Sequence, residues 1–182
     1  MEATLRVGDV VLAEKVSVKL QLPLEVEDLV LFAPPPALLE TVEAAGGKLG
    51  SRDLFVKRVA AVGGDTVELL PTGEVSVNGR RRPRPPLACD GTAESASPEG
   101  VGRTDATPVT RQIPAGSVFV LGDCAPRSTD SRTWGPLPVE KVVARPVVRI
   151  WPVDRQGAIV EEADLNPFRR VFEQSDRGNK NF

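Results

Sequence analysis

The chain has 182 residues, of which 41% are hydrophobic and 26% are charged, and its formal net charge is −2. This composition is ordinary for one sizeable soluble domain, or for one domain that carries an insertion. The slight acidity argues against bulk electrostatic capture by nucleic acid or by an anionic membrane. The sequence contains no histidine and only two cysteines, which fit no zinc-ligand spacing, so we expect no metal site.

Short strand patterns separated by turn signals run along most of the chain. Apolar, partly β-branched runs predict strands over 10–16, 28–33, 54–62, 66–70, 74–77, 117–121 and 142–151. Apolar residues from Leu38 to Ala45 repeat at helical spacing and Gly46-Gly47 follows, which predicts one short helix. Because strands and helices do not alternate, we expect a mainly β fold of antiparallel strands rather than a parallel α/β sheet.

Between Arg80 and Gln112 the strand pattern gives way to Arg, Pro, Gly, Ser and Thr. This composition predicts a loop-rich insertion over 80–112. The basic run from Arg80 to Arg84 favours a solvated loop over a nucleic-acid surface, because no aromatic side chain is interleaved for base stacking. We therefore expect no nucleic-acid partner.

The rest of the sequence divides into one domain and a tail. We predict a domain over 1–154 and a polar extension over 155–182, in which 163–174 has helical spacing. No stretch approaches the roughly twenty apolar residues that span a bilayer, and no signal peptide opens the chain, so the chain as written is expected to be soluble. Cys89 and Cys124 can form a disulfide or remain two free thiols, because the sequence does not reveal their separation.

Lys57 stands within an apolar run that extends from Leu54 to Val62 and ends at Gly63-Gly64-Asp65. A strand of this kind carries the ammonium toward low dielectric, and burial disfavours the charged form, so we expect a lowered pKa. A lysine that is neutral near working pH can act as a general base. The alternative is a lysine that extends its amine into solvent from a strand edge.

A polar segment over 121–138 follows the predicted strand over 117–121. Its Asp, Ser and Pro residues favour a rigid turn, through side-chain-to-backbone hydrogen bonds and restricted φ. Asp130 and Arg132 can pair, and Trp134 supplies an apolar anchor. Next to the lysine strand, such a loop can hold a hydroxyl against the amine. The residues alone are equally compatible with a purely structural turn.

Four sequence blocks occur in a fixed order. They are Met1-Glu2-Ala3-Thr4-Leu5, then Val7 to Ser17, then Phe55-Val56-Lys57-Arg58-Val59 with Gly64-Asp65, and finally Gly122-Asp123 with Ser128 to Pro138. Together they resemble the blocks of type I signal peptidases, membrane-anchored serine proteases that remove leader peptides with a Ser/Lys dyad. Within the family, Ala13-Glu14-Lys15-Val16-Ser17 is most similar to the plastid members, the thylakoidal processing peptidases. The resemblance runs to about Asp154 and implies a mainly β signal-peptidase fold, with one short helix and a long loop insertion.

The resemblance also implies roles for individual residues. Lys57 is the general base, and Ser128 hydrogen-bonds to the lysine and orients it. The residues that support this pair structurally are Arg58, Asp123, Asp130, Ser131 and Arg132, through the pairs Asp123–Arg58 and Asp130–Arg132. The residues that line the shallow substrate pockets are Met1, Leu5 and Val56. Such pockets exclude large side chains, which explains cleavage after Ala-x-Ala type sequences.

By the same resemblance, the partners are preproteins that bear leader peptides, and no cofactor is required. An anchor missing from this chain would attach the enzyme to a membrane. The plastid likeness implies the chloroplast thylakoid, with the active site facing the lumen.

The sequence departs from the family pattern at several positions. The family's nucleophilic serine immediately precedes the methionine that is Met1 here, so this chain lacks it, together with the anchor and the hydroxyl residue of the oxyanion hole. Ala3 replaces a proline, and Cys124-Ala125 replaces an Asn-Arg pair. We therefore expect the chain as written to be inactive, either because its start is assigned at an internal methionine or because it is a short non-catalytic paralogue.

Three other functions are alternatives to leader-peptide removal. A non-catalytic β-rich peptide-binding module, or pseudo-peptidase, would tolerate the loss of the serine. A self-cleaving Ser/Lys repressor-type peptidase shares the dyad but needs a DNA-binding helical domain, which the sequence does not predict. An RNA-binding β-barrel that uses Arg80 to Arg84 conflicts with the acidic balance of the chain.

Overall fold

The computed structural model of the chain describes residues 4–50, 52–82, 107–124 and 128–159. The strands are β1 (Val10–Glu14), β2 (Leu29–Phe32), β3 (Phe55–Val62), β4 (Thr66–Leu69), β5 (Val75–Val77), β6 (Arg80–Arg81), β7 (Val109–Gln112), β8 (Ser117–Leu121), β9 (Leu137–Pro138), β10 (Val142–Trp151) and β11 (Gly157–Ala158). The helices are α1 (Val16–Lys19), α2 (Pro36–Ala44) and α3 (Ser131–Trp134), with 3-10 turns η2 (Val139–Lys141) and η3 (Val153–Arg155). The prediction of a mainly β fold is confirmed.

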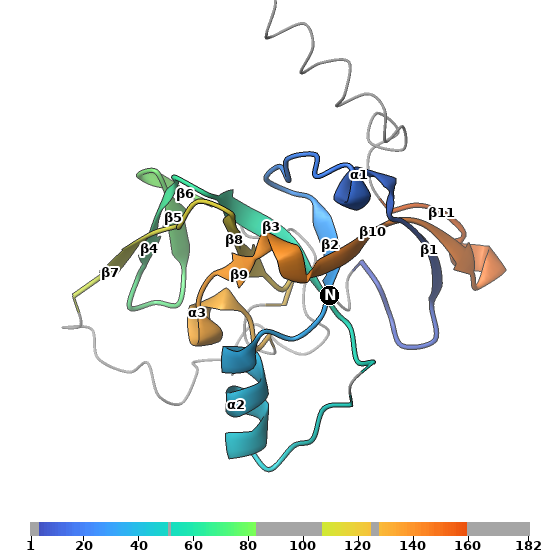
Figure 1. Cartoon of the computed structure of the whole chain (residues 1–182), viewed down its shortest axis with the longest axis horizontal. Helices are drawn as coiled ribbons and strands as arrows, with labels where there is room; N and C mark the ends of the chain where they lie inside the picture. Colours follow the sequence, from blue (N-terminus) through green and yellow to red (C-terminus); the bar gives the residue numbers. More distant parts are fainter. Residues whose placement is uncertain (1–3, 51, 83–106, 125–127, 160–182) are drawn as a thin grey trace, which may run out of the picture.

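The strands form two antiparallel sheets (Figure 1). The larger sheet has seven strands in the order β1-β10-β2-β3-β8-β9, with β11 paired to β10. The smaller sheet has four strands in the order β6-β5-β4-β7. Within the larger sheet, Lys57 of β3 is opposite Val30 of β2, and Arg58 is opposite both Leu29 of β2 and Leu121 of β8. This register places both cations of β3 in the middle of the sheet.

Residues 59–61 of β3 and 118–120 of β8 are all buried. Because successive side chains of a strand point to opposite sides, both faces of these stretches are covered. One core joins the larger sheet to α2 and α3 and contains Val30, Phe32, Leu38, Val59, Val118, Val120, Trp134, Leu137 and Val142. The other core contains Ala60, Ala61, Val67, Val75, Ile113 and Phe119, from the larger and the smaller sheet. Fully burying a large apolar side chain contributes about 1.5–3 kcal/mol. These two cores therefore hold β3 and β8 in fixed positions.

Local structure differs from the predictions at three places. The strand predicted over 10–16 ends at Glu14, because its carboxylate accepts hydrogen bonds from the amide and hydroxyl of Ser17 and starts α1. The predicted insertion over 80–112 begins and ends in strands, since β6 pairs with β5 and β7 pairs with β4. The polar segment after β8 contains the one-turn helix α3, in addition to the predicted helix, which is α2.

Two further predictions are not settled by these elements. The segment 163–174, for which helical spacing was noted, lies outside the described residues. Across the described ranges, no helix combines the length and the apolar character that crossing a bilayer requires.

Candidate active site

Lys57 and Ser128 lie in hydrogen-bonding contact. Lys57 comes from the middle of β3, and its Nζ donates to Ser128 Oγ at 2.8 Å. The lysine is half-buried, and its pKa is lowered from 10.5, chiefly because burial disfavours the ammonium. The charge of Arg132 lowers this pKa further, whereas the carboxylates of Asp130 and Asp123 raise it. The amine is therefore easier to deprotonate than a free lysine.

Gly122 makes the contact between these two side chains possible. A Cβ atom at this position would lie 2.1 Å from Ser128 Oγ and 3.3 Å from Lys57 Nζ. A contact of 2.1 Å is far inside the van der Waals limit, so any side chain would displace the serine. The sequence motif that contains Gly122 gives no sign of this steric function, which only the geometry reveals.

Asp130 fixes the loop that carries Ser128. Its carboxylate is fully buried and accepts from Gly122 N at 3.0 Å, from Arg132 Nε at 2.9 Å and from Arg132 Nη2 at 2.8 Å. The same carboxylate caps α3 by accepting from the backbone N–H of Arg132. Ser131 Oγ accepts from Val120 N at 3.0 Å, which ties the loop to β8. The loop and the end of β8 thus form one hydrogen-bonded unit.

Trp134 anchors the other end of this loop. Its side chain is buried, and its ring centroid lies 6.0 Å from that of Phe32 on β2. Tilted ring pairs at this separation add modestly to the stabilisation from burial. The structure therefore gives Trp134 the anchoring position that the sequence suggested.

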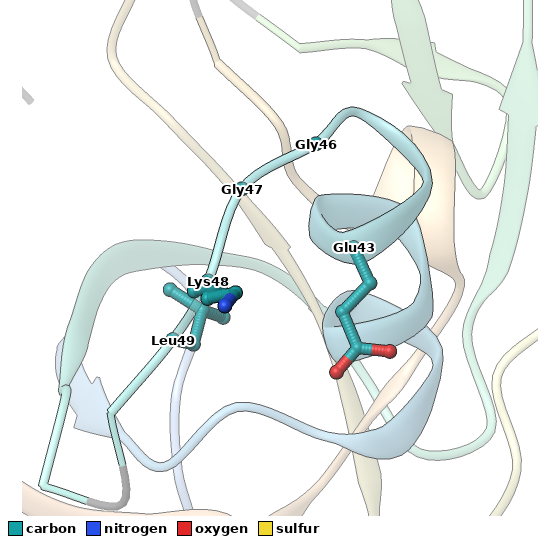
Figure 2. A pocket seen from close by; sticks show the side chains of 5 residues that line it. All are labelled: Glu43, Gly46, Gly47, Lys48 and Leu49. Atoms are coloured by element: carbon teal, nitrogen blue, oxygen red, sulfur yellow. The ribbon is translucent and has the colours of Figure 1, made fainter.

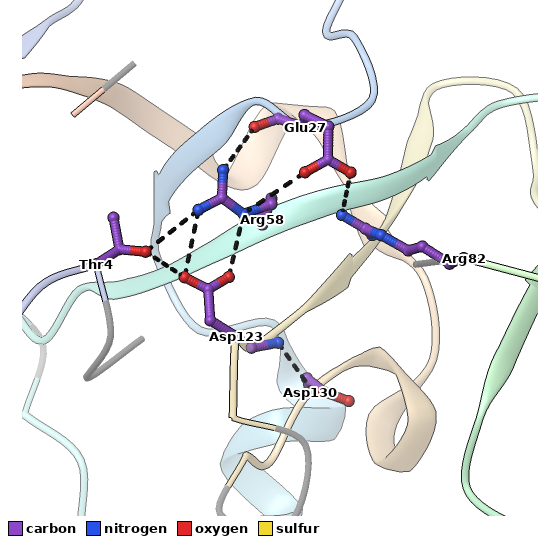
Figure 3. Close-up of polar contacts among 7 residues, drawn as sticks. Thr4, Glu27, Arg58, Arg82, Asp123 and Asp130 are labelled. Atoms are coloured by element: carbon purple, nitrogen blue, oxygen red, sulfur yellow. Dashed lines mark hydrogen bonds and ion pairs between the residues drawn. The ribbon is translucent and has the colours of Figure 1, made fainter. Parts of the chain in front are cut away.

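Arg58, the neighbour of Lys57 on β3, forms an ion pair with Asp123 (Figure 3). Arg58 Nε donates to Asp123 Oδ1 at 3.1 Å, and Arg58 Nη2 donates to Oδ2 at 3.3 Å. Thr4 Oγ1 donates to Asp123 Oδ2 and accepts from Arg58 Nη2 at 3.3 Å. Burial alone would raise the pKa of Asp123, but the hydrogen bonds from Arg58 and Thr4 and the Arg58 charge outweigh it, and the pKa is lowered. Thr4, which was not assigned a role from sequence, ties the N-terminal segment to β3.

The structure describes only some of the predicted pocket residues and only one of the two cysteines. Met1 lies outside the described residues, whereas Leu5 and Val56 are both partly exposed. Cys124 is buried and disulfide-bonded. Of the two states that the sequence allowed, a disulfide or free thiols, the structure therefore has the disulfide at Cys124. Cys89 lies outside the described residues.

The basic run after β5 is less solvated than predicted. The side chain of Arg81 is 76% exposed, but that of Arg82 is only 12% exposed, because Arg82 turns inward to meet Glu27. The prediction of a solvated loop is therefore wrong for Arg82. No charge pattern in the sequence distinguishes it from its neighbours, since its partner lies far away along the chain.

Other features of the described residues do not contribute to this site. A shallow hollow of about 440 Å³ beside the end of α2 is lined by Glu43, Gly46, Gly47, Lys48 and Leu49 (Figure 2). Lys57 and Ser128 are not among these residues. Within the described ranges, no group of His, Cys, Asp or Glu is arranged to hold a metal ion.

Comparison with known proteins gives matches along most of the chain. The protein family described as "Signal peptidase, peptidase S26" matches residues 1–151. The probable thylakoidal processing peptidase 2, chloroplastic, of Arabidopsis thaliana is 36% identical over 171 residues, which cover 94% of this chain and 41% of that protein. Thylakoidal processing peptidase 1 of the same plant is 42% identical over 152 residues, which cover 84% of this chain and 39% of that protein.

A cyanobacterial protein and a solved structure also match. The probable signal peptidase I-2 of Synechocystis is 33% identical, with 90% of this chain and 65% of that protein covered. The crystal structure of a signal peptidase I from Enterococcus faecalis matches with a TM-score of 0.38 and 20% identity, over 68% of this chain and 96% of that one. The chain spans about two fifths of the length of its two plant relatives. Since the family match extends over residues 1–151, the chain belongs to the signal peptidase family, peptidase S26.

Proposed function

We propose that this chain carries the base of a Ser/Lys dyad that removes leader peptides after small residues of the Ala-x-Ala type. The observation that carries the proposal is the 2.8 Å hydrogen bond from Lys57 Nζ to Ser128 Oγ. It is made by a half-buried amine whose pKa is lowered by burial. Lys57 acts as general base and Ser128 orients it, whereas the nucleophile is the serine that the family pattern places directly before Met1.

The mechanism uses the amine twice. Neutral Lys57 takes the proton of the nucleophilic hydroxyl as its oxygen attacks the scissile carbonyl, and the lysinium then gives that proton to the leaving amine. For a substantial fraction of the amine to be neutral near pH 8, its pKa must lie about two below that of free lysine, which costs roughly 3 kcal/mol. Burial contributes to this change in the free protein, and a bound leader that excludes water from the amine adds to it.

The position of Thr4 supports the placement of the nucleophile. Thr4 hydrogen-bonds to Asp123, the neighbour of Gly122, and Gly122 lies against both Ser128 and Lys57. A residue directly before Met1 is four positions from Thr4, a span of at most about 14 Å. Thr4 is thus fastened to Asp123 and Arg58, and the chain length from Thr4 allows a nucleophile before Met1 to reach Lys57. Leu5 and Val56 are partly exposed, as residues that line a substrate groove together with Met1 would be.

The relatives suggest where the whole protein works. Two plant relatives are named chloroplastic thylakoidal processing peptidases. We infer that the whole protein acts on preproteins in the thylakoid, from a membrane anchor outside these residues and with its site facing the lumen. Fractionation of chloroplasts, with protease protection of intact thylakoids, tests this placement.

Cleavage of a synthetic leader peptide with an Ala-x-Ala site tests the reaction. Two proteins are compared, the 182-residue chain and a form extended upstream through a serine directly before Met1. We expect the extended form to cleave after the last alanine and the shorter chain to leave the peptide intact, because it supplies no nucleophile. Lys57→Met in the extended form is the matched variant, and we expect it to be inactive.

Two results would count against the proposal. Full cleavage by the 182 residues alone would show that the nucleophile lies elsewhere in the chain. Tight binding of the leader without cleavage by the extended form, unaffected by Lys57→Met, would instead favour the non-catalytic peptide-binding module.

A further inference from the structure

Glu27 meets Arg58 through both its backbone and its side chain (Figure 3). Its carbonyl oxygen accepts from Arg58 Nη1 at 3.2 Å, and its Oε2 lies 3.7 Å from Arg58 Nε. The backbone of Glu27 has a φ of 77°, and its amide donates to Val59 O at 2.9 Å. A non-glycine residue with positive φ is unfavourable and persists where the surroundings hold it in place. The backbone of Glu27 is therefore held against β3, while its side chain is 61% exposed.

Arg82 supports Glu27 from the smaller sheet. Arg82 Nη2 donates to Glu27 Oε1 at 2.5 Å, and its amide donates to Val75 O of β5 at 3.1 Å. Its Nη1 is buried without a hydrogen-bond partner among the described residues. Burial lowers the pKa of Arg82, and the charge of Glu27 opposes this effect. A largely buried guanidinium is costly unless it is paired, so Glu27 is the counter-charge that keeps Arg82 in this position.

We propose that Glu27 and Arg82 are positioning residues, which hold Arg58 in the orientation that joins Asp123 to Thr4 beside the dyad. The four charges alternate along the series Arg82, Glu27, Arg58 and Asp123, so each guanidinium lies next to a carboxylate. The series links the smaller sheet, the approach to β2 and the turn after β8. Only its consequence for catalysis rests on the proposed function.

Two hypotheses about the role of Glu27 predict opposite changes in the pKa of Lys57 when Glu27 is replaced. The charged groups that face Lys57 are Asp130, Arg132 and Asp123, with Arg58 adjacent on β3. If Glu27 acted only through space, removing its negative charge would lower the pKa of Lys57. If Glu27 positions Arg58, its loss lets Arg58 withdraw from Asp123, and the less compensated carboxylate raises the pKa of Lys57.

The test is an NMR titration of the lysine side chains in the 182-residue chain labelled with ¹³C-lysine. The Lys57 signal is assigned by its absence in Lys57→Met. In Glu27→Gln we expect the Lys57 pKa to rise by about 0.3 or more. Arg82→Met should raise it as well, but the loss of a positive charge does so through space too, so Glu27→Gln is the decisive variant. Glu74→Gln is the matched control, because Glu74 pairs with exposed Arg81 on the same hairpin at 3.5 Å, and we expect no change there.

Folding of each variant is checked by thermal unfolding. If Glu27→Gln does not fold, Glu27→Gly replaces it, because glycine adopts the positive φ without strain and also lacks the carboxylate. A fall in the Lys57 pKa, or no change, in the Glu27 variant would overturn the positioning role.

The titration needs no proteolysis, so its result does not depend on leader cleavage. The positioning role can therefore be disproved while the proposed function holds, or confirmed while the proposed function fails. In the extended form, we expect the pH profile of kcat/KM to move to higher pH by the same amount as the titration, with KM unchanged.

Discussion

Lys57 and Arg58 are neighbours on β3, yet the surroundings of these two cations differ. The nearest partner of the Lys57 amine is the hydroxyl of Ser128 at 2.8 Å, and its pKa is lowered mainly by burial. The nearest partner of Arg58 is the carboxylate of Asp123 at 3.1 Å. A half-buried cation beside a neutral acceptor becomes available as a base, whereas one beside a carboxylate becomes a fixed electrostatic support.

The largest expected effect is on kcat/KM, and it tests whether Lys57 acts as a base, which Arg58 as a guanidinium cannot do. In the extended form, Lys57→Met should reduce kcat/KM on the order of 10⁴-fold, because the general base is lost. Lys57→Arg should be equally inactive, since a guanidinium keeps its charge and cannot accept the proton. Steady-state cleavage of the leader peptide measures both, with Lys19→Met on the exposed end of α1 as control. Activity retained in Lys57→Arg would break the comparison.

The next effect concerns the loop that presents Ser128 to Lys57. Asp130→Ala removes a buried acceptor and leaves the Arg132 guanidinium and the Gly122 amide without it. We expect the free energy of unfolding to fall by about 3–5 kcal/mol, as for other broken buried ion pairs. Urea unfolding measures this change, and Asp53→Ala, at an exposed carboxylate, should cost far less. A loss below about 1 kcal/mol would show that the loop does not depend on Asp130.

Gly122→Ala tests whether the hydrogen bond to the neutral Ser128 hydroxyl is what distinguishes Lys57 from Arg58. The added Cβ would meet Ser128 Oγ at 2.1 Å, so the serine must move away from the amine. We expect kcat/KM of the extended form to fall about 100-fold, with a stability loss of about 1–3 kcal/mol. A crystal structure of the variant with the Lys57–Ser128 hydrogen bond intact would contradict this expectation.

The smallest effect is the pH dependence of stability. The native pKa of Lys57 lies below its unfolded value of 10.5, so between these two values the unfolded state binds more protons and stability rises with pH. Below the native pKa the full cost of the buried charge remains. We therefore expect Lys57→Met to be more stable at pH 7, by about 1 kcal/mol for a half-buried group.

This advantage of Lys57→Met should shrink as the pH rises from the native pKa of the lysine toward 10.5. Urea unfolding at a series of pH values measures it, and the exposed-site variant Lys19→Met should show no such trend. An advantage that grows with pH would mean that the lysine pKa is raised in the folded state.

Much of the fold could be anticipated from local sequence, whereas the pairing of Lys57 with Ser128 was expected only from the resemblance to the signal peptidase family. The strand over 142–151 and the strand over 117–121 appear with the predicted bounds, because long β-branched runs carry a clear signal. Glu14 could not be predicted as a strand end, since its bond to Ser17 competes with strand pairing through a local side-chain contact. The strands β6 and β7 have weak patterns of their own and depend on pairing with β5 and β4.

The sequence by itself determined the mainly β architecture and the blocks that place Lys57, Ser128 and Asp130 in one site. The architecture follows from apolar periodicity, which is a local property. The roles of the blocks follow from their resemblance to the signal peptidase family. Tertiary structure alone decided the roles of Gly122, Glu27 and Arg82. Their effects depend on a missing Cβ and on charges brought together from distant segments, and neither can be read from residues that are neighbours only after folding.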